Sequence, residues 1–261
     1  MEPGFDLHSA PLLPQTCLRS TYERVRQLPL SLQMEDCVDQ LTHPDVLVEE
    51  MRDAFDAVTL AFASHDGPTP VPEWARAGEI QAYGRDARAP FFYPGRDVAV
   101  IGGRRAFTCL AVDLDPLSGF PIQGAGEGGG LDFIGLTCDE TATPVLGGVQ
   151  SRRETSAYPV FLRLLAALTE IAPETQLRRL NAPCFRGTLR EKPAFDLGLV
   201  LWNEPASSER VPLAQLTRDL AERVKRAVRS HRQGGSRLRD VVCLRMNPDR
   251  FDGRLRYDWH V

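Results

Sequence analysis

Residues 131–150, LDFIGLTCDETATPVLGGVQ, decide the fold of this chain. Two short apolar runs, 131–137 and 144–150, enclose the polar sequence CDETAT, and this order predicts a β-hairpin. The run that follows, 157–172, carries apolar residues at helical spacing and predicts an amphipathic helix. A strand–turn–strand–helix unit therefore stands at the centre of the chain.

Further periodic runs extend this unit in both directions. Apolar residues at helical spacing predict a helix at 45–63, and two β-rich runs within 97–115 flank Gly102-Gly103, which predicts a tight hairpin. Towards the C-terminus the pattern predicts strands at 194–202, 239–246 and 254–261 and a helix at 212–231. This order predicts an α/β fold with a mixed sheet and helices on both faces.

The first 44 residues differ from the rest because they contain several prolines and show weak periodicity. We expect an irregular N-terminal arm at 1–44, with one short helix near 33–41. The α/β domain is expected at 45–261, with its core at about 45–203 and a C-terminal helix and strands at 204–261.

Composition is that of an ordinary soluble domain, with 43% hydrophobic and 25% charged residues among 261. The net charge of −4 gives no global case for nucleic acid. No apolar run is long enough for a membrane helix, and the N-terminus lacks the pattern of a secretory signal. The six cysteines are scattered without zinc-site spacing, as expected of reduced thiols. We therefore expect a cytoplasmic protein with no membrane partner.

In its order of elements and in the stretch 131–150, the chain resembles the PD-(D/E)XK, or restriction-endonuclease-like, nuclease superfamily. The resemblance covers roughly residues 45–203. Asp132 corresponds to the family's first acid, and Gly148-Val149-Gln150 falls on its acid–x–lysine motif. The resemblance implies a restriction-endonuclease-like sheet and, in active members, Mg²⁺ held by carboxylates for phosphodiester cleavage.

The motif is incomplete in this chain. Gly148 supplies no carboxylate, and Gln150 can form hydrogen bonds but cannot carry charge or act as a base. If the protein is active, the catalytic residues are Asp132, Gln150 and Glu154, and Asp132 and Glu154 bind the Mg²⁺. Asp113 and Glu50 remain alternatives to Glu154 as the second acid.

A basic stretch within 218–245 contains nine Lys and Arg residues and three acids, a formal balance of +6. A solvated helix face explains such a pattern without any function, because basic residues are favourable near a helix C-terminus. The functional interpretation is a surface that contacts phosphates. Its candidate residues are Arg152, Arg153, Arg223, Arg226, Arg229 and Arg232.

Three hypotheses follow. In the first, a nuclease-fold protein with a degenerate metal site acts by binding DNA, RNA or a partner protein. In the second, the chain is a Mg²⁺-dependent nuclease whose second carboxylate has moved. In the third, it is a subunit that needs another protein, which docks on the arm at 1–41 or on the proline-rich loop at 66–72.

Overall fold

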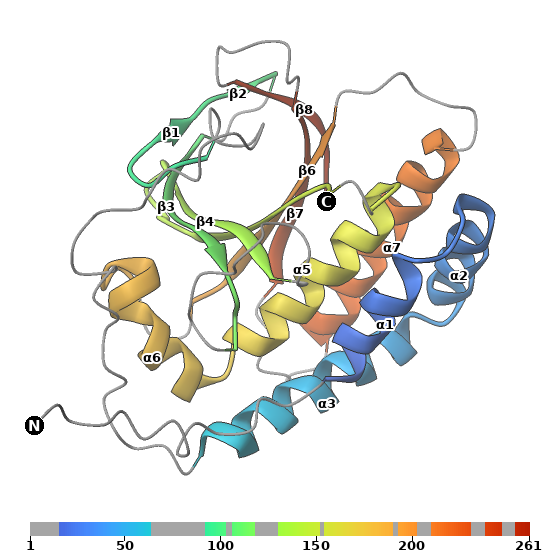
Figure 1. Cartoon of the computed structure of the whole chain (residues 1–261), viewed down its shortest axis with the longest axis horizontal. Coiled ribbons are helices and arrows are strands. Elements are labelled where there is room, and N and C mark those ends of the chain that lie inside the picture. The colour runs from blue at the N-terminus through green and yellow to red at the C-terminus, as the bar shows by residue number, and fades with distance from the viewer. Residues whose placement is uncertain are drawn as a thin grey trace, which may run out of the picture.

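A computed structural model shows a mixed α/β fold (Figure 1). It describes residues 16–63, 92–102, 106–117, 130–151, 154–189, 193–202, 210–230, 238–246 and 254–261. The described helices are α1 (Cys17–Val25), α2 (Leu30–Thr42), α3 (Pro44–Phe62), α5 (Ala157–Ile171), α6 (Glu174–Phe185) and α7 (Arg210–Ser230). The described strands are β1 (Asp97–Val98), β2 (Val100–Ile101), β3 (Phe107–Leu114), β4 (Leu131–Thr137), β5 (Pro144–Val149), β6 (Phe195–Trp202), β7 (Leu238–Met246) and β8 (Leu255–His260).

The described strands form one sheet in the order β1-β3-β4-β5-β6-β7-β8-β2. The central hairpin is confirmed, since β4 pairs antiparallel with β5 and Phe133 lies opposite Gly147. Strands β5, β6 and β7 are parallel, and a parallel pair needs a long crossover, which α5 and α6 supply between β5 and β6. The predicted strands at 131–137, 144–150, 194–202, 239–246 and 254–261 are confirmed within one residue at each end.

The sheet curls until one segment joins its two edges. Strands β1 and β2 are separated only by Ala99, yet β1 pairs with β3 and β2 pairs with β8. The segment 97–101 therefore closes a ring of strands, and Figure 1 looks through the opening of this ring. The two runs around Gly102-Gly103 do pair antiparallel, because β1 pairs with β3, but the predicted tight hairpin is wrong, because Val100 and Ile101 directly before Gly102 pair with the distant β8.

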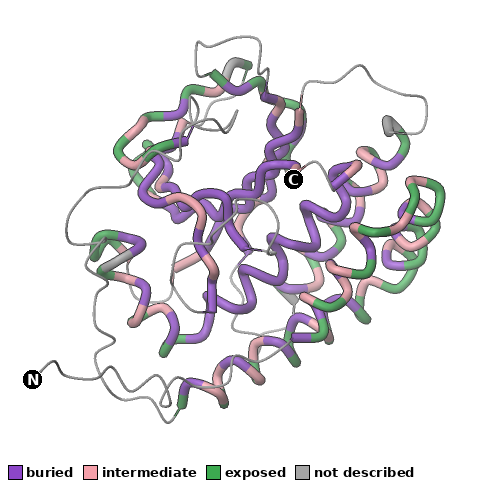
Figure 2. The backbone as a smooth tube through the Cα atoms, viewed as in Figure 1, coloured by how far each residue is buried: buried purple, intermediate pink, exposed green. Residues whose placement is uncertain are grey.

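The prediction of helices on both faces of the sheet is also wrong for the described residues. Helix α5 packs on β5 and β6, α7 packs on β7, and α6 packs on β3 and β4, all on the outer face of the curl (Figure 1). The inner face has a separate apolar cluster of strand residues and Phe92. Because the ring encloses that face, much of it is buried without a helix (Figure 2).

An aromatic stack and a glycine allow the strands to curl tightly. The Phe133 ring stacks between Phe92 and Phe107, with ring centroids 4.4 and 5.2 Å away. A Cβ atom at Gly147 would lie 2.0 Å from Cζ of Phe133, so only glycine leaves room for that ring.

The N-terminal segment is more helical than expected: α2 confirms the short helix predicted near 33–41, but α1 stands where irregular structure was expected. Thr16 caps α1 by accepting the Arg19 backbone N–H at 3.2 Å, and Leu18, Tyr22 and Val25 are at most 1% exposed. These side chains join the same core as α3 and α5, so the described residues show no structural boundary at residue 44. Helix α6 was not predicted either. Residues 1–15 and the proline-rich loop at 66–72 lie outside the described residues.

Candidate functional site

The fold brings three of the predicted site residues together beside β5. Asp132 is the second residue of β4, Gln150 follows β5, and Glu154 precedes α5. Their exposed fractions are 5%, 8% and 1% respectively, so all three are buried. The backbone N–H of Val149 donates to Oδ2 of Asp132 at 2.7 Å, which ties the carboxylate to the end of β5.

An arginine lies between the two carboxylates. Arg163 of α5 is 2% exposed, and its Nη1 donates to Oδ2 of Asp132 at 2.7 Å. Its Nε lies 3.0 Å from Oε1 of Glu154, and its Nη2 donates to the Val149 carbonyl at 2.8 Å. The chain thus supplies its own cation to Asp132 and Glu154.

The charge of this arginine is strongly favoured. Burial alone would lower the pKa of Arg163, but the charges of Asp132 and Glu154 more than reverse this, so the pKa is raised. Arg163 is therefore a permanent cation between Asp132 and Glu154, and we call these three residues the Arg163 centre.

The glycine at position 148 has a structural reason. A Cβ atom on Gly148 would lie 3.2 Å from Arg163 Nη2, Leu164 Cγ and Val160 Cγ1. A longer acidic side chain at this position would collide with α5. Arg163 and the side chains of α5 therefore occupy the space beside Gly148.

Gln150 holds the backbone around the centre. Its Nε2 donates to the Glu154 carbonyl at 2.7 Å, and its Oε1 accepts the Trp202 backbone N–H at 3.2 Å. The Trp202 indole N–H also donates to the Gln150 carbonyl at 2.7 Å. Because both ends of the amide are engaged, Gln150 links the end of β5 to β6 and to the start of α5.

Helix α1 also contributes a contact to the Arg163 centre. The Tyr22 hydroxyl donates to Oε1 of Glu154 at 3.1 Å, and the Ser151 backbone N–H donates to Oε2 at 2.8 Å. Burial raises the pKa of Tyr22, and the negative charge of Glu154 raises it further. The phenol is therefore a stable hydrogen-bond donor to Glu154.

Sequence reasoning did not find Arg163 or Tyr22. The available signal for Arg163 was a basic residue within the apolar run 157–172. Such a residue must find buried acceptors, because an unpaired charge inside a protein is very unfavourable. Tyr22 belongs to the segment that was expected to be irregular.

The alternative second acids come from α3 and from β3, where Asp113 lies between the residues that pair with Leu131 and Phe133 of β4. Glu50 on α3 accepts the Thr21 hydroxyl at 3.1 Å, and Asp113 lies within β3 with a left-handed φ of 51°. Within the part of the chain that the structure describes, no three His, Cys, Asp or Glu residues are placed to hold a metal ion. As arranged around Arg163, the Asp132 and Glu154 side chains do not fit a Mg²⁺ site.

The predicted phosphate-binding arginines are only partly described. Arg152, Arg153 and Arg232 lie outside the described residues. Arg223, Arg226 and Arg229 are exposed on α7. Arg223 donates to the Leu41 carbonyl at 3.1 Å, Arg229 donates to the Arg239 carbonyl at 3.0 Å, and Arg226 is paired with Glu222.

Comparison with protein-family models, curated proteins and solved structures found no match for this chain. Among the described helices, none combines the length and apolar character needed to cross a membrane.

Proposed function

We propose that this protein acts by binding nucleic acid through the arginines of α7, on a nuclease-like fold whose metal site has been replaced by an internal ion pair. The kinship with PD-(D/E)XK nucleases is part of the proposal. Its support is the order α3, β3, β4, β5, α5, β6, together with an acid at Asp132 beside the end of β5.

The observation that carries the proposal is the position of Arg163 between Asp132 and Glu154. For Mg²⁺ to bind there, the arginine would have to leave two carboxylates while remaining in an apolar core. Removing the partner of a buried charge costs about 3–5 kcal/mol. Because Mg²⁺ also loses hydration water reluctantly, the ion pair disfavours a metal-dependent reaction at this centre.

The arginines of α7 favour nucleic acid over a protein partner. Arg218, Arg223, Arg226 and Arg229 are exposed on one helix, and the hydrogen bonds of Arg223 and Arg229 are to carbonyl groups, which leave their charge uncompensated. Such a surface attracts phosphates in a salt-dependent way.

Fluorescence anisotropy with labelled DNA and RNA tests this binding. We expect affinity to fall as salt rises, and the triple variant Arg223→Gln, Arg226→Gln, Arg229→Gln to flatten the salt dependence by about 0.9 per lost phosphate contact. Arg178→Gln is the control, since Arg178 is 78% exposed on α6 in a comparable pair with Glu174. Absence of binding at low salt overturns the nucleic-acid proposal and leaves the protein partner as the hypothesis to pursue.

The second candidate is a Mg²⁺-dependent nuclease, favoured by the convergence of Asp132 and Glu154 on one cation. It requires that Arg163 withdraws. Purified protein incubated with Mg²⁺ or Mn²⁺ and single- or double-stranded DNA or RNA discriminates the two candidates. Our proposal predicts no cleavage above that of an Asp132→Asn variant shown to be folded. Cleavage that this variant lacks would instead establish the nuclease.

A further inference from the structure

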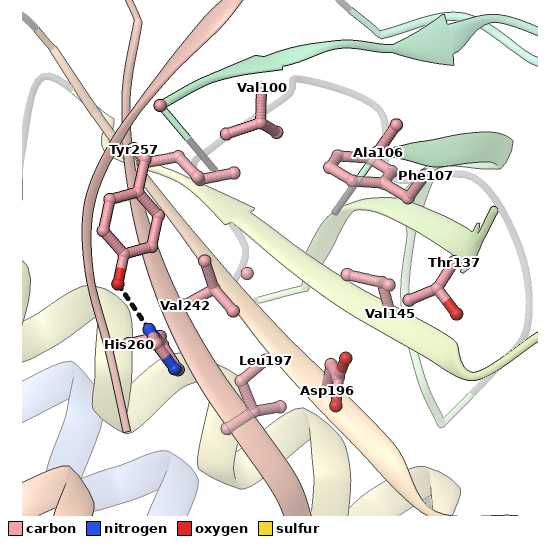
Figure 3. Close-up of a pocket in the computed structure, with 13 residues that line it drawn as sticks. Val100, Ala106, Phe107, Thr137, Val145, Asp196, Leu197, Val242, Tyr257 and His260 are labelled. Atoms are coloured by element: carbon pink, nitrogen blue, oxygen red, sulfur yellow. Dashed lines mark hydrogen bonds between the residues drawn. The ribbon is translucent and has the colours of Figure 1, made fainter. Parts of the chain in front are cut away.

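The inner face of the curled sheet lines a partly open cavity of about 420 Å³ (Figure 3). It lies across the sheet from α5 and Arg163, and it plays no part in the function proposed above. The described residues that line it come mainly from strands β2 to β8. They include Val100, Phe107, Val145, Asp196, Val242, Leu244, Tyr257 and His260.

A β-bulge directs two polar side chains of β8 into this cavity. Cys243 lies opposite Trp259 and Leu244 lies opposite Tyr257, so Asp258 is the extra residue. Residues three apart on a regular strand point to opposite faces. The bulge instead puts Tyr257 and His260 on the same face, where the Tyr257 hydroxyl is hydrogen-bonded to Nδ1 of His260 (Figure 3).

Asp196 carries a formal negative charge in the described lining, and an ion pair with Arg239 balances this charge. Asp196 is 2% exposed. Arg239 donates two hydrogen bonds to its carboxylate, from Nε to Oδ1 at 2.8 Å and from Nη2 to Oδ2 at 2.6 Å. A register shift between β6 and β7 places Arg239 beside Asp196, because Arg239 is the extra residue opposite Phe195 and Asp196. The negative charge of Asp196 in the described lining is therefore balanced by Arg239 behind it.

Apart from Thr137, the remaining described lining is apolar, and the cavity has a size that suits two rings. A cavity of about 150 Å³ is known to accept one benzene ring, and this one is more than twice that volume. The rings of Phe107 and Tyr257 stand on opposite sides of the cavity in Figure 3, with Val145 and Val242 between them.

We infer that this cavity binds a neutral, largely apolar small molecule of about two rings, with a hydroxyl or carbonyl group that bonds to the Tyr257–His260 pair. A charged ligand is disfavoured because it would lose hydration without gaining an unpaired counter-charge in the described lining. Mostly apolar walls with a few convergent polar groups are typical of small-molecule sites.

Binding is tested with N-phenylnaphthylamine, a neutral probe whose fluorescence rises in apolar surroundings. At about pH 8 we expect saturable binding, displacement by naphthol, and little displacement by naphthoate. Absence of saturable probe binding overturns the inference. Stronger displacement by naphthoate overturns the assignment of a neutral ligand.

The cavity variant is Val242→Phe, because Val242 lies opposite His260 in the β7–β8 register and projects into the space. We expect it to weaken probe binding at least about tenfold. The matched control is Val46→Phe, at a position on α3 that is 49% exposed, which should leave binding unchanged. Equal affinity in wild type and Val242→Phe would place the probe elsewhere and contradict the inference.

Two further variants guard against misfolding and test the polar end. At Gly198 an added Cβ would meet Val145 Cγ1 at 3.4 Å and Phe133 Cζ at 3.5 Å, which are ordinary contacts. The Gly198→Ala variant should therefore fold and still bind the probe more weakly than wild type. His260→Phe should lower the affinity for naphthol more than the affinity for the probe, because only naphthol has a hydroxyl group. Equal losses of affinity would contradict the role of the Tyr257–His260 pair.

Discussion

At the scale of single residues, the most important contact is that of Arg163 with Asp132 and Glu154. Asp132 and Glu154 are separated by 22 positions in the chain, and the Arg163 guanidinium contacts both. The closeness of Asp132 to the end of β5 could be predicted, because the hairpin 131–150 fixes that register. The presence of Arg163 could not, because its contact with Asp132 depends on how α5 packs across the sheet.

Replacing Arg163 should destabilise the protein strongly. Arg163→Met removes the cation that contacts both buried carboxylates, so we expect the free energy of unfolding to fall by about 3–5 kcal/mol. Urea denaturation followed by circular dichroism measures this change. Arg178→Met is the control, because Arg178 is largely exposed and a surface change of this kind should stay within about 0.5 kcal/mol. A loss below about 1 kcal/mol for Arg163→Met would contradict the structural role of the ion pair.

At the scale of elements, the long periodic runs and the short helix near 33–41 were predicted, whereas α1 and α6 were not. The runs behind α3, α5 and α7 extend over four turns or more, which makes the helical period clear. Helix α1 has only nine residues, and α6 contains Pro183, which is a helix breaker in most contexts. Their structure depends on packing against α5 and its neighbours, which local periodicity does not report.

The inclusion of α1 in the core makes a direct prediction. Leu18 on α1 is 0% exposed, so Leu18→Ala should lower the free energy of unfolding by about 2–5 kcal/mol. Leu32→Ala on α2 is the matched control, since Leu32 is 43% exposed. Chemical denaturation of the two variants gives the comparison. If both variants lose the same small amount, the segment 17–25 behaves as the irregular arm expected from its sequence.

At the scale of the whole molecule, the curl of the sheet is the feature least visible in the sequence. Nearly continuous apolar strands predict a sheet covered on both faces, and the usual cover is a layer of helices on each. Here the second face is buried by closure of the sheet around Phe133 and its neighbours. That closure depends on β2 reaching β8, which lies more than 150 residues further along the chain.

Closure of the ring predicts slow hydrogen exchange at Leu255. Its backbone N–H donates to the Ala99 carbonyl at 3.0 Å, the contact that joins the segment 97–101 to β8. The amide of Asp45, in the first turn of α3, is a suitable reference because first-turn amides have no helical acceptor. Exchange followed by NMR should be slower at Leu255 than at Asp45. Equal rates would mean that the ring is open in solution.

The most direct measurement of the central claim is a crystal structure of the protein grown with manganese, examined by anomalous scattering. We predict that Arg163 remains between Asp132 and Glu154 and that no ion lies within the roughly 2.1 Å that a divalent metal keeps from carboxylate oxygens. An ion bound by both carboxylates, with the Arg163 side chain displaced, would contradict the claim that the chain's own cation has replaced the metal.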